Sequence, residues 1–294
     1  MTGLEDPYRN RGFGGLPEDG ERYETAASVV LPVPYERTTS WHTGTYLGPH
    51  AAILASRQLE LYDEELRCEP AATGIATLAP PRHLTAEPSL ALRAIREAAQ
   101  DVLGDGKFLV ALGGEHTISL PLVEATRAVH GEVGVLHFDA HADLRDRYEG
   151  TRYSHACVMR RIRELGCPTL SVGIRSLSAE EAAWADSEGV PILWAHQAPS
   201  VADLGRAIAA LPTKIYLTFD VDYFDPALVP ATGTPEPGGG GWHATLDLLR
   251  EAFRTREVVA VDLVELAPTP GHHASDFLVA KLAYKCIGYR HHEI

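Results

Sequence analysis

The sequence has few cysteines, no long apolar run and a shortage of basic residues. Its 294 residues include four cysteines, at positions 68, 157, 167 and 286, and no two of them form a Cys-x-x-Cys pair. This spacing argues against a disulfide scaffold and a zinc ribbon. Lys and Arg total 26 against 40 Asp and Glu, a formal net charge of −14. Such an acidic balance disfavours a nucleic-acid partner and weakly favours a cationic substrate.

Segments that would place the chain in a membrane or export it are also lacking. No apolar run approaches the roughly 18 residues that a transmembrane helix requires. Residues 1–23 are polar, rich in Gly and Pro, and without the apolar stretch of a secretory signal. We therefore expect a cytoplasmic protein with no membrane partner.

What the chain does contain is an alternation of short apolar, β-branched runs with amphipathic stretches. The runs predict strands at 28–33, 107–112, 133–138, 169–174, 190–194, 214–219 and 258–264. The stretches predict helices at 88–103, 118–129, 155–165, 179–188, 201–211, 246–254 and 275–288. Near-continuous apolar strands separated by helices are typical of a mostly parallel sheet covered on both faces. We expect an α/β fold in one domain over residues 1–294, with a partly irregular N-terminal extension at 1–25.

Acidic and imidazole side chains follow four of these strands, at the carboxyl ends where parallel sheets bind ligands. The sequence at these ends reads Gly113-Gly114-Glu115-His116-Thr117, Asp139-Ala140-His141-Ala142-Asp143, Asp220-Val221-Asp222 and Glu265. Asp139, His141 and Asp143 are two residues apart, so an extended chain there would direct all three to one side. Asp220 and Asp222 repeat this spacing.

Four clustered aspartates need compensating positive charge. Each pair of carboxylates about 4 Å apart costs on the order of 4 kcal/mol at an effective dielectric constant of about 20. Two divalent cations would cancel the four charges, and His116 and His141 complete a set of six ligands that suits a two-metal hydrolytic centre. Oxygen-rich ligands with some imidazole and no thiolate favour Mn²⁺, with Co²⁺, Zn²⁺ or Ni²⁺ as alternatives.

Each motif has an ordinary structural explanation when it is taken alone. Asp143 could cap a helix, and His116 could donate one hydrogen bond near a helix start. The metal hypothesis is favoured because the structural explanation would bury four carboxylates without partners.

A longer series of motifs runs through most of the chain. It comprises Val33-Pro34-Tyr35, Gly44-Thr45, Gly48-Pro49, Gly113 to Thr117, His137 to Asp143, Ser154-His155, Ser171 to Arg175, Phe219 to Asp222, Asp225-Pro226, Gly233 to Gly239, Val261-Asp262 and Glu265. In this order the series resembles the ureohydrolase family, which contains the arginases and agmatinases.

The resemblance implies a three-layer α/β/α fold around an eight-stranded, mostly parallel sheet, as in arginases and deacetylases, assembled into trimers or hexamers. It implies two Mn²⁺ ions per subunit, one held by His116, Asp139, Asp143 and Asp220 and the other by Asp139, His141, Asp220 and Asp222. The family reaction is attack of hydroxide on a guanidinium carbon, with release of urea and an amine. By the same resemblance, Glu265 pairs with the guanidinium, His155 transfers a proton near the leaving amine, and Asp143 joins them in the catalytic set.

The loop after the Asp-x-His-x-Asp motif bears on the choice of guanidine. It carries Arg145 where arginases have an Asn that recognises the amino-acid end of the substrate, whereas residues 233–239 and Arg160-Arg161 resemble agmatinases. Ala156-Cys157 resembles a subgroup with members that prefer aminopropylagmatine. We predict hydrolysis of agmatine to putrescine or of aminopropylagmatine to spermidine, in polyamine synthesis, with arginase or guanidinobutyrase activity as alternatives.

Proteins of other classes remain as alternatives. A mononuclear zinc deacetylase on the same fold would not need His116, Asp143 and Asp222. A metallophosphatase would need an Asn-His-Asp segment, and Glu265 would repel its phosphate. A catalytically silent relative would have lost a metal ligand, and none is missing from the sequence.

Four further residues near these motifs are predicted to be unimportant for the chemistry. Glu115 replaces a more usual Asp and is expected to face away from the metals and to matter little. His42, His272 and His273 are expected in loops at the mouth of the pocket, as solvated side chains.

Overall fold

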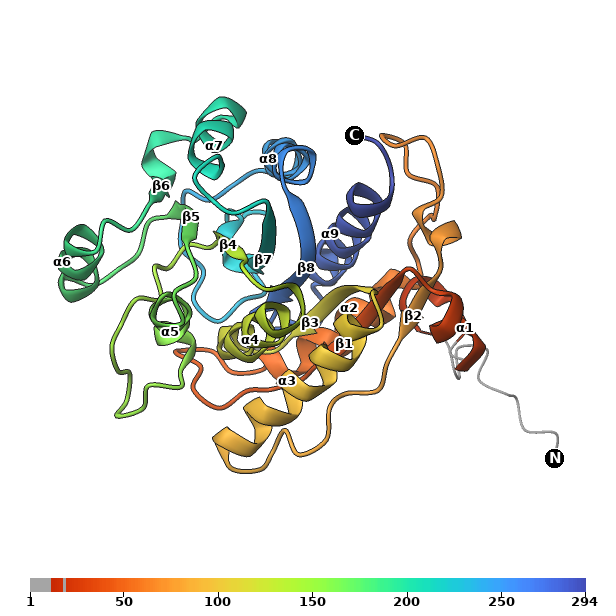
Figure 1. Cartoon of the computed structure of the whole chain (residues 1–294), viewed down its shortest axis with the longest axis horizontal. Helices are drawn as coiled ribbons and strands as arrows, with labels where there is room; N and C mark the ends of the chain where they lie inside the picture. The colour runs from red at the N-terminus through yellow and green to blue at the C-terminus, as the bar shows by residue number, and fades with distance from the viewer. Residues whose placement is uncertain (1–11, 18–19) are drawn as a thin grey trace.

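Within residues 12–17 and 20–294, which the computed structural model describes, eight strands form one parallel sheet (Figure 1). Their order across the sheet is β2-β1-β3-β8-β7-β4-β5-β6. The strands are β1 (Ser28–Val33), β2 (Ile75–Thr77), β3 (Phe108–Gly113), β4 (Gly134–Phe138), β5 (Thr169–Ile174), β6 (Ile192–Trp194), β7 (Lys214–Asp220) and β8 (Glu257–Val264).

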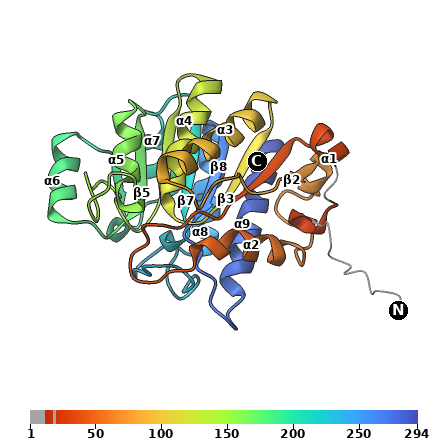
Figure 2. The ribbon, with the colours of Figure 1, turned by 90° about the horizontal axis from the view of Figure 1, so that it is seen from below.

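Helices cover both faces of this sheet. They are α1 (Gly20–Thr25), α2 (Gly48–Ser56), α3 (Pro88–Gly104), α4 (Ser119–His130), α5 (Val158–Glu164), α6 (Ala179–Ser187), α7 (Val201–Ile208), α8 (Trp242–Thr255) and α9 (Ala274–His291). Figure 1 shows α3, α4 and α5 on one side of the sheet and α7, α8 and α9 on the other. The turned view of Figure 2 places α2 beside α9, which it contacts. The predicted three-layer α/β/α fold is therefore confirmed.

Alternate residues of the central strands pack into two separate apolar cores. In β3, Phe108 and Val110 face the core that contains α2, α7, α8 and α9, whereas Leu109 and Ala111 face the core that contains α3, α4 and α5. Successive side chains of a strand point to opposite faces, so strands buried on both sides must be apolar throughout. This requirement explains why their runs were recognisable in the sequence.

Strand β8 joins two halves of the sheet that are otherwise separate. On one side it pairs with β3, which is followed by His116, and on the other with β7, which ends at Asp220. Glu265 directly follows β8 itself. All strands run in the same direction, so these residues reach the same edge of the sheet.

Two predictions from the sequence differ from the observed elements. The short strand β2 and the helices α1 and α2 are absent from the elements that the apolar pattern predicted. The predicted helix at 155–165 is divided into a 3₁₀ turn, η5 (His155–Cys157), and α5. The expected N-terminal extension at 1–25 lies partly outside the described residues. In the described part of the chain, no helix combines the length and apolar character needed to cross a membrane.

Candidate metal centre

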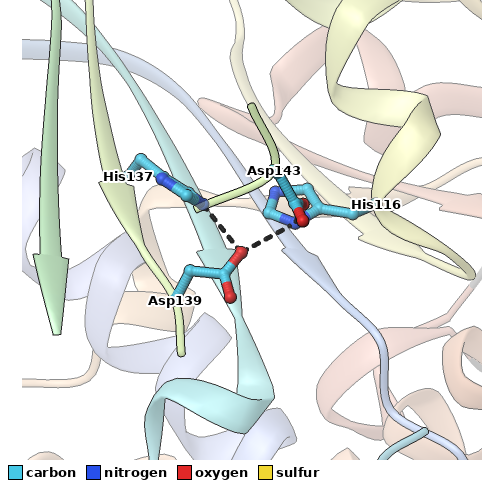
Figure 3. Close-up of side chains that lie close together, drawn as sticks. All are labelled: His116, His137, Asp139 and Asp143. Carbon is cyan, nitrogen blue, oxygen red and sulfur yellow. Dashed lines mark hydrogen bonds and ion pairs between the residues drawn. The ribbon is translucent and has the colours of Figure 1, made fainter. Parts of the chain in front are cut away.

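Carboxylates from two strand ends, those of β4 and β7, surround the imidazole of His116. Its Nδ1 atom lies 3.1 Å from Asp139 Oδ2, 3.2 Å from Asp143 Oδ2 and 3.4 Å from Asp220 Oδ2. Figure 3 shows His116, Asp143, Asp139 and His137 pointing toward one another. All of these side chains are buried.

The hydrogen bonds of Thr218 determine which nitrogen of His116 carries the proton. Thr218 Oγ1 donates its single hydrogen to Asp262 Oδ1 at 2.7 Å, so it accepts from His116 Nε2, which is 2.8 Å away. In the neutral imidazole Nδ1 is then an acceptor, although it faces three carboxylate oxygens and makes no hydrogen bond within the described residues. A buried nitrogen lone pair among carboxylates is the donor set that a divalent cation requires.

A second group of ligands adjoins the first. His141 Nδ1 lies 2.8 Å from Asp222 Oδ2 and 3.6 Å from Asp139 Oδ1. Asp139 therefore directs one carboxylate oxygen toward each histidine. Candidate ligand atoms of Asp139, His141 and Asp222 lie within 4.8 Å of one another, as do those of His116, His137, Asp139 and Asp143. The six residues predicted from the sequence are thus brought together, and they could hold metal ions.

Proton equilibria in this cluster reflect its crowded negative charge. Burial raises the pKa of Asp143 to about 6, assisted by the charge of Asp139. Burial and the charges of Asp222 and Asp139 raise the pKa of Asp220 well above its usual value. Burial alone would lower the pKa of His116, but the adjacent carboxylates outweigh it and raise that pKa well above the ordinary value. These protons compensate the negative charge when no metal is bound, and a divalent cation would displace the one on His116 Nδ1 and use the lone pair described above.

The backbone around the ligands differs from the extended chain expected from the two-residue spacing. Asp143 has a φ of 54°, in the left-handed region. Asp222 lies in a 3₁₀ turn, η7 (Val221–Tyr223), and donates its backbone N–H to Asp220 Oδ1 at 2.8 Å. The expectation that extended geometry aligns these side chains is therefore wrong. Turns at the strand ends bring the ligands together instead.

Two buried residues near the ligands have roles that the sequence interpretation missed. His137 Nε2 lies 2.7 Å from Asp139 Oδ2, and its Nδ1 lies 3.0 Å from Ser171 Oγ, so it orients the shared carboxylate. Glu115 accepts hydrogen bonds from the backbone of Arg37 and Thr38, both at 2.6 Å, and from the Thr38 hydroxyl at 2.8 Å. The prediction that Glu115 matters little is wrong, because it holds the segment that contacts His155.

A cavity of about 240 Å³ lies against the metal cluster. Its wall includes the ligands His141, Asp143, Asp220 and Asp222 together with His155 and Glu265. Both residues expected to act on substrate therefore face the same space as the candidate metal ligands.

Glu265 is fixed by the backbone at the end of β8. Its Oε1 atom accepts a hydrogen bond from the backbone N–H of His116 at 2.7 Å, and its side chain is buried. Burial and the nearby charge of Glu115 raise the pKa of Glu265 well above its usual value. A Cβ at Gly233 would lie 4.0 Å from Oε2 and 3.5 Å from the carbonyl oxygen of Ser40, both ordinary contact distances, so Gly233 borders the cavity directly beside Glu265.

His155 is held by hydroxyl groups on both sides of its ring. Nδ1 lies 3.2 Å from Thr38 Oγ1, and Nε2 lies 3.1 Å from Ser40 Oγ, which in turn lies 2.8 Å from the Tyr148 hydroxyl. Burial, followed by the positive charges of His116 and His141, lowers the pKa of His155 to about 4. Its imidazole is therefore neutral at neutral pH.

The three loop histidines do not contribute side chains to this cavity among the described residues. His42 is exposed and contacts the ring of Trp41, at 5.4 Å between centroids. His272 and His273 are also exposed, and His273 Nδ1 lies 3.5 Å from Asp276 Oδ2. Solvated loop positions are consistent with the prediction for all three.

Comparison with known proteins places the whole arrangement in one family. The Arginase family matches residues 26–288, which include every candidate ligand, His155 and Glu265. The chain belongs to the arginase family. This membership confirms the resemblance to ureohydrolases found in the sequence.

Individual members of the arginase family are similar to the chain over most of its length. An N(1)-aminopropylagmatine ureohydrolase from Synechocystis sp. is 46% identical over 275 residues, which cover 91% of this chain and 90% of that protein. An agmatinase from Pyrococcus horikoshii is 33% identical, covering 88% of this chain and 90% of that protein. The crystal structure of agmatine ureohydrolase from Thermoplasma volcanium superposes with a TM-score of 0.83 at 31% identity, covering 91% of both chains.

Proposed function

We propose that this protein hydrolyses the guanidinium group of a small cationic guanidine, releasing urea and an amine. The observation that carries the proposal is the position of Asp139 between two His/Asp groups, beside a cavity that also contains Glu265 and His155. Similarity to an aminopropylagmatine ureohydrolase and to an agmatinase supports aminopropylagmatine or agmatine as substrate, with spermidine or putrescine as the amine product. Either reaction would serve polyamine synthesis.

The proposed cofactor is a pair of Mn²⁺ ions in each subunit. His116, Asp139, Asp143 and Asp220 would hold one ion, and Asp139, His141, Asp220 and Asp222 would hold the other. Oxygen ligands with two imidazoles and no thiolate suit this metal. When bound, the ions supply Lewis acidity that lowers the pKa of the attacking water.

Residues of the chain provide substrate orientation and proton transfer in this reaction. The oxygen of water bonds to the guanidinium carbon, and the bond from that carbon to the tail nitrogen breaks. Glu265 would accept hydrogen bonds from the guanidinium and fix its orientation. His155, neutral at neutral pH, would take up a proton and deliver it to the departing amine, while Thr38 and Ser40 hold its ring. Asp143 would act with them as part of the catalytic set.

Urea release provides the direct test of this function. The Mn²⁺-loaded protein is assayed with aminopropylagmatine, agmatine, arginine and guanidinobutyrate, and its metal content is measured on the same sample. We expect urea from the first two compounds and two metal ions per chain. One zinc ion per chain, amide hydrolysis and no urea would instead identify a mononuclear deacetylase.

The surroundings in which the protein works are part of the same proposal. We infer that the chain acts as one ureohydrolase domain in the cytoplasm, assembled as a homotrimer or homohexamer. The assembly is inferred from the family resemblance, and the single domain is supported by the one continuous sheet over the described residues.

A further inference from the structure

A wall of the cavity that contains none of the candidate metal ligands must accommodate the tail of the guanidine. This wall is formed by the loop after Asp143 and the turn before α6, and it includes Arg145, Tyr148, Ser178 and Glu181. Arg145 and Glu181 are the charged side chains of this wall. An arginine lining a cavity for a cationic substrate would repel the tail unless its charge were otherwise engaged.

Glu181 presents a fixed carboxylate to this wall. Its Oε1 accepts the backbone N–H of Leu144 at 3.0 Å, and its Oε2 accepts both the backbone N–H and the hydroxyl of Ser178 at 2.8 Å. Only 3% of the residue is exposed. A carboxylate offers about four lone-pair sites, so these three donors leave capacity for one more.

The guanidinium of Arg145 is held only loosely beside that carboxylate. Arg145 Nε lies 3.6 Å from Glu181 Oε2, too far for a hydrogen bond, and 37% of the arginine side chain is exposed. The guanidinium carbon lies 5.6 Å from the centroid of the Tyr148 ring. Arg145 therefore satisfies the charge of Glu181 without the short contacts that would make its position permanent.

The backbone beneath Arg145 is firmly fixed, in contrast to its head group. The backbone N–H of Arg145 donates to the carbonyl oxygen of Ala156 at 3.1 Å. The next residue, Asp146, accepts a hydrogen bond from the buried Arg161 at 3.0 Å. Movement of the guanidinium alone would thus expose Glu181 and Tyr148 to the cavity without displacing the loop.

Given the proposed function, on which this step rests, we propose that Glu181 and the Tyr148 ring form a cation subsite that Arg145 fills in the free protein and an ammonium group of the substrate tail fills in its place. An ammonium is compact and carries three donors, so it can approach the carboxylate more closely than Arg145 does. The ring of Tyr148 attracts a cation on its face. A tail without positive charge gains nothing by displacing Arg145, so the subsite selects polyamine-like guanidines.

Binding of spermidine tests this subsite separately from catalysis, because spermidine has ammonium groups but no guanidinium. Its affinity for the full-length, Mn²⁺-loaded protein is measured by calorimetry. Arg145→Gln should tighten binding about two- to fivefold, because a weakly held competitor is removed. The matched control is Arg147→Gln in the same loop, where the exposed arginine donates to the carbonyl oxygen of Gly150 at 3.3 Å, and it should leave binding unchanged.

Removing the proposed subsite should have the opposite effect. Glu181→Gln should weaken spermidine binding about tenfold, since a hydrogen bond to a charged group is lost. Glu181 also forms the capping box at the start of α6, so Glu181→Gln could weaken binding by destabilising this helix. A second pair of variants, at Tyr148, tests the subsite without changing the cap. Tyr148→Leu should weaken binding about two- to fivefold, whereas Tyr148→Phe, which keeps the ring, should not.

The subsite is refuted if Arg145→Gln weakens binding or leaves it unchanged, or if Tyr148→Leu binds as tightly as Tyr148→Phe. If Arg145→Gln lowered the affinity for guanidinobutyrate more than the affinity for spermidine, Arg145 would instead bind the carboxylate of a substrate tail, which would also refute the subsite. Urea release from aminopropylagmatine, measured on the same preparations, tests the proposed reaction separately from the proposed subsite. If the variants change spermidine affinity as expected but no urea is released, only the proposed reaction is refuted. If urea is released but the spermidine affinities do not change as expected, only the subsite is refuted.

Discussion

At the scale of single residues, Asp139 has the most demanding position in the candidate metal centre. One of its oxygens faces His116 and is contacted by His137, while the other faces His141. Its side chain also fixes the neighbouring turn, because Oδ1 accepts the backbone N–H of His141 at 2.5 Å. Loss of either oxygen therefore affects both proposed ion positions at once.

We expect Asp139→Asn to remove metal and urea release together. The amide nitrogen cannot act as a ligand, so metal content should fall below one ion per chain and turnover by more than about 100-fold. Elemental analysis and the urea assay measure the two effects. The control is Asp101→Asn on the exposed surface of α3. Wild-type metal content and turnover in Asp139→Asn would show that the shared position is wrongly assigned.

Glu265→Gln should separate substrate orientation from metal binding. The amide oxygen can still accept the N–H of His116, so the fold and the metal content should be preserved. The charge that orients the guanidinium is lost, and kcat/KM should fall by about tenfold or more. Steady-state kinetics measure kcat/KM for this variant and for the control Glu97→Gln, which changes an exposed glutamate of α3. Unchanged kcat/KM would exclude a guanidinium contact for Glu265.

The sequence predicted the six candidate ligand residues that the structure brings together, but not the residues that hold them in place. Acidic and imidazole side chains at strand ends are visible as a pattern because their chemistry has few other uses there. His137 and Glu115 were missed because a single buried His or Glu carries no such pattern. Their partners, Ser171 and residues 37–38, are distant in sequence and adjacent only in the folded protein.

At the scale of secondary-structure elements, the turn after β3 depends on a very close backbone approach. A Cβ at Gly114 would lie 2.1 Å from the carbonyl oxygen of Tyr35. That same oxygen accepts the N–H of Glu115 at 2.9 Å, so it cannot move away without losing a hydrogen bond. Gly114 therefore keeps β3, the segment after β1 and His116 in register.

Gly114→Ala should lower the free energy of unfolding by about 3 kcal/mol or more, because backbone atoms must separate. Gly104→Ala is a matched control, since a Cβ at this end of α3 meets no atom within 4 Å. This control should be neutral or stabilising by up to about 1 kcal/mol. Denaturant unfolding of the two variants under identical metal conditions measures the difference. Equal stabilities would contradict the close approach.

The bounds of elements with strong periodic patterns were predicted to within a few residues. The elements that were missed are short or begin with residues that also suit a turn. Six of the eight strands, β1, β3, β4, β5, β7 and β8, form apolar runs of five to eight residues that are buried almost throughout, which a sequence displays directly. β2 has three residues at the sheet edge, too few for a pattern. α2 begins at Gly48-Pro49, residues that resemble a turn as much as a helix start.

At the scale of the whole molecule, a buried lysine connects the C-terminal helix to a loop more than 200 residues earlier. Lys285 of α9 is fully buried, and its Nζ lies 2.9 Å from Asp63 Oδ1 and 3.0 Å from Glu65 Oε2. Burial would raise the pKa of Asp63, but backbone N–H groups and Lys285 outweigh it and lower that pKa below 3.8. Burial would lower the pKa of Lys285, but Asp63 and Glu65 outweigh it and raise that pKa.

The directions of these two shifts determine the pH range of the contact. Asp63 has a lower pKa in the folded protein, so its contribution exists above about pH 4 and is lost as the pH falls further. Lys285 has a raised pKa, so its contribution is complete below about pH 10 and is lost at higher pH. The contact should therefore stabilise the fold throughout the neutral range.

Lys285→Met should reduce the free energy of unfolding at pH 7 by about 3–5 kcal/mol, because it leaves Asp63 buried without its partner. The deficit should be smaller at pH 3.5, below the ordinary pKa of an aspartate, because Asp63 of the unfolded chain then binds a proton and the contribution of the lysine contact decreases. Adding Asp63→Asn to the lysine variant should recover much of the loss. Denaturant unfolding at both pH values measures these differences. An equal loss of unfolding free energy at pH 7 and pH 3.5 would show that Lys285 stabilises the fold by packing alone and not through the charge of Asp63.

The central position of β8 determines when the metal centre can form during synthesis on the ribosome. Strands up to β7 can assemble only as two separate groups, because β3 and β7 are not neighbours until β8 is inserted between them. His116 belongs to one group, and the carboxylates after β4 and β7 belong to the other. A nascent chain that has not yet released residue 264 from the exit tunnel therefore cannot bring the carboxylates after β4 and β7 to His116, and the candidate metal centre can form only after β8 has emerged.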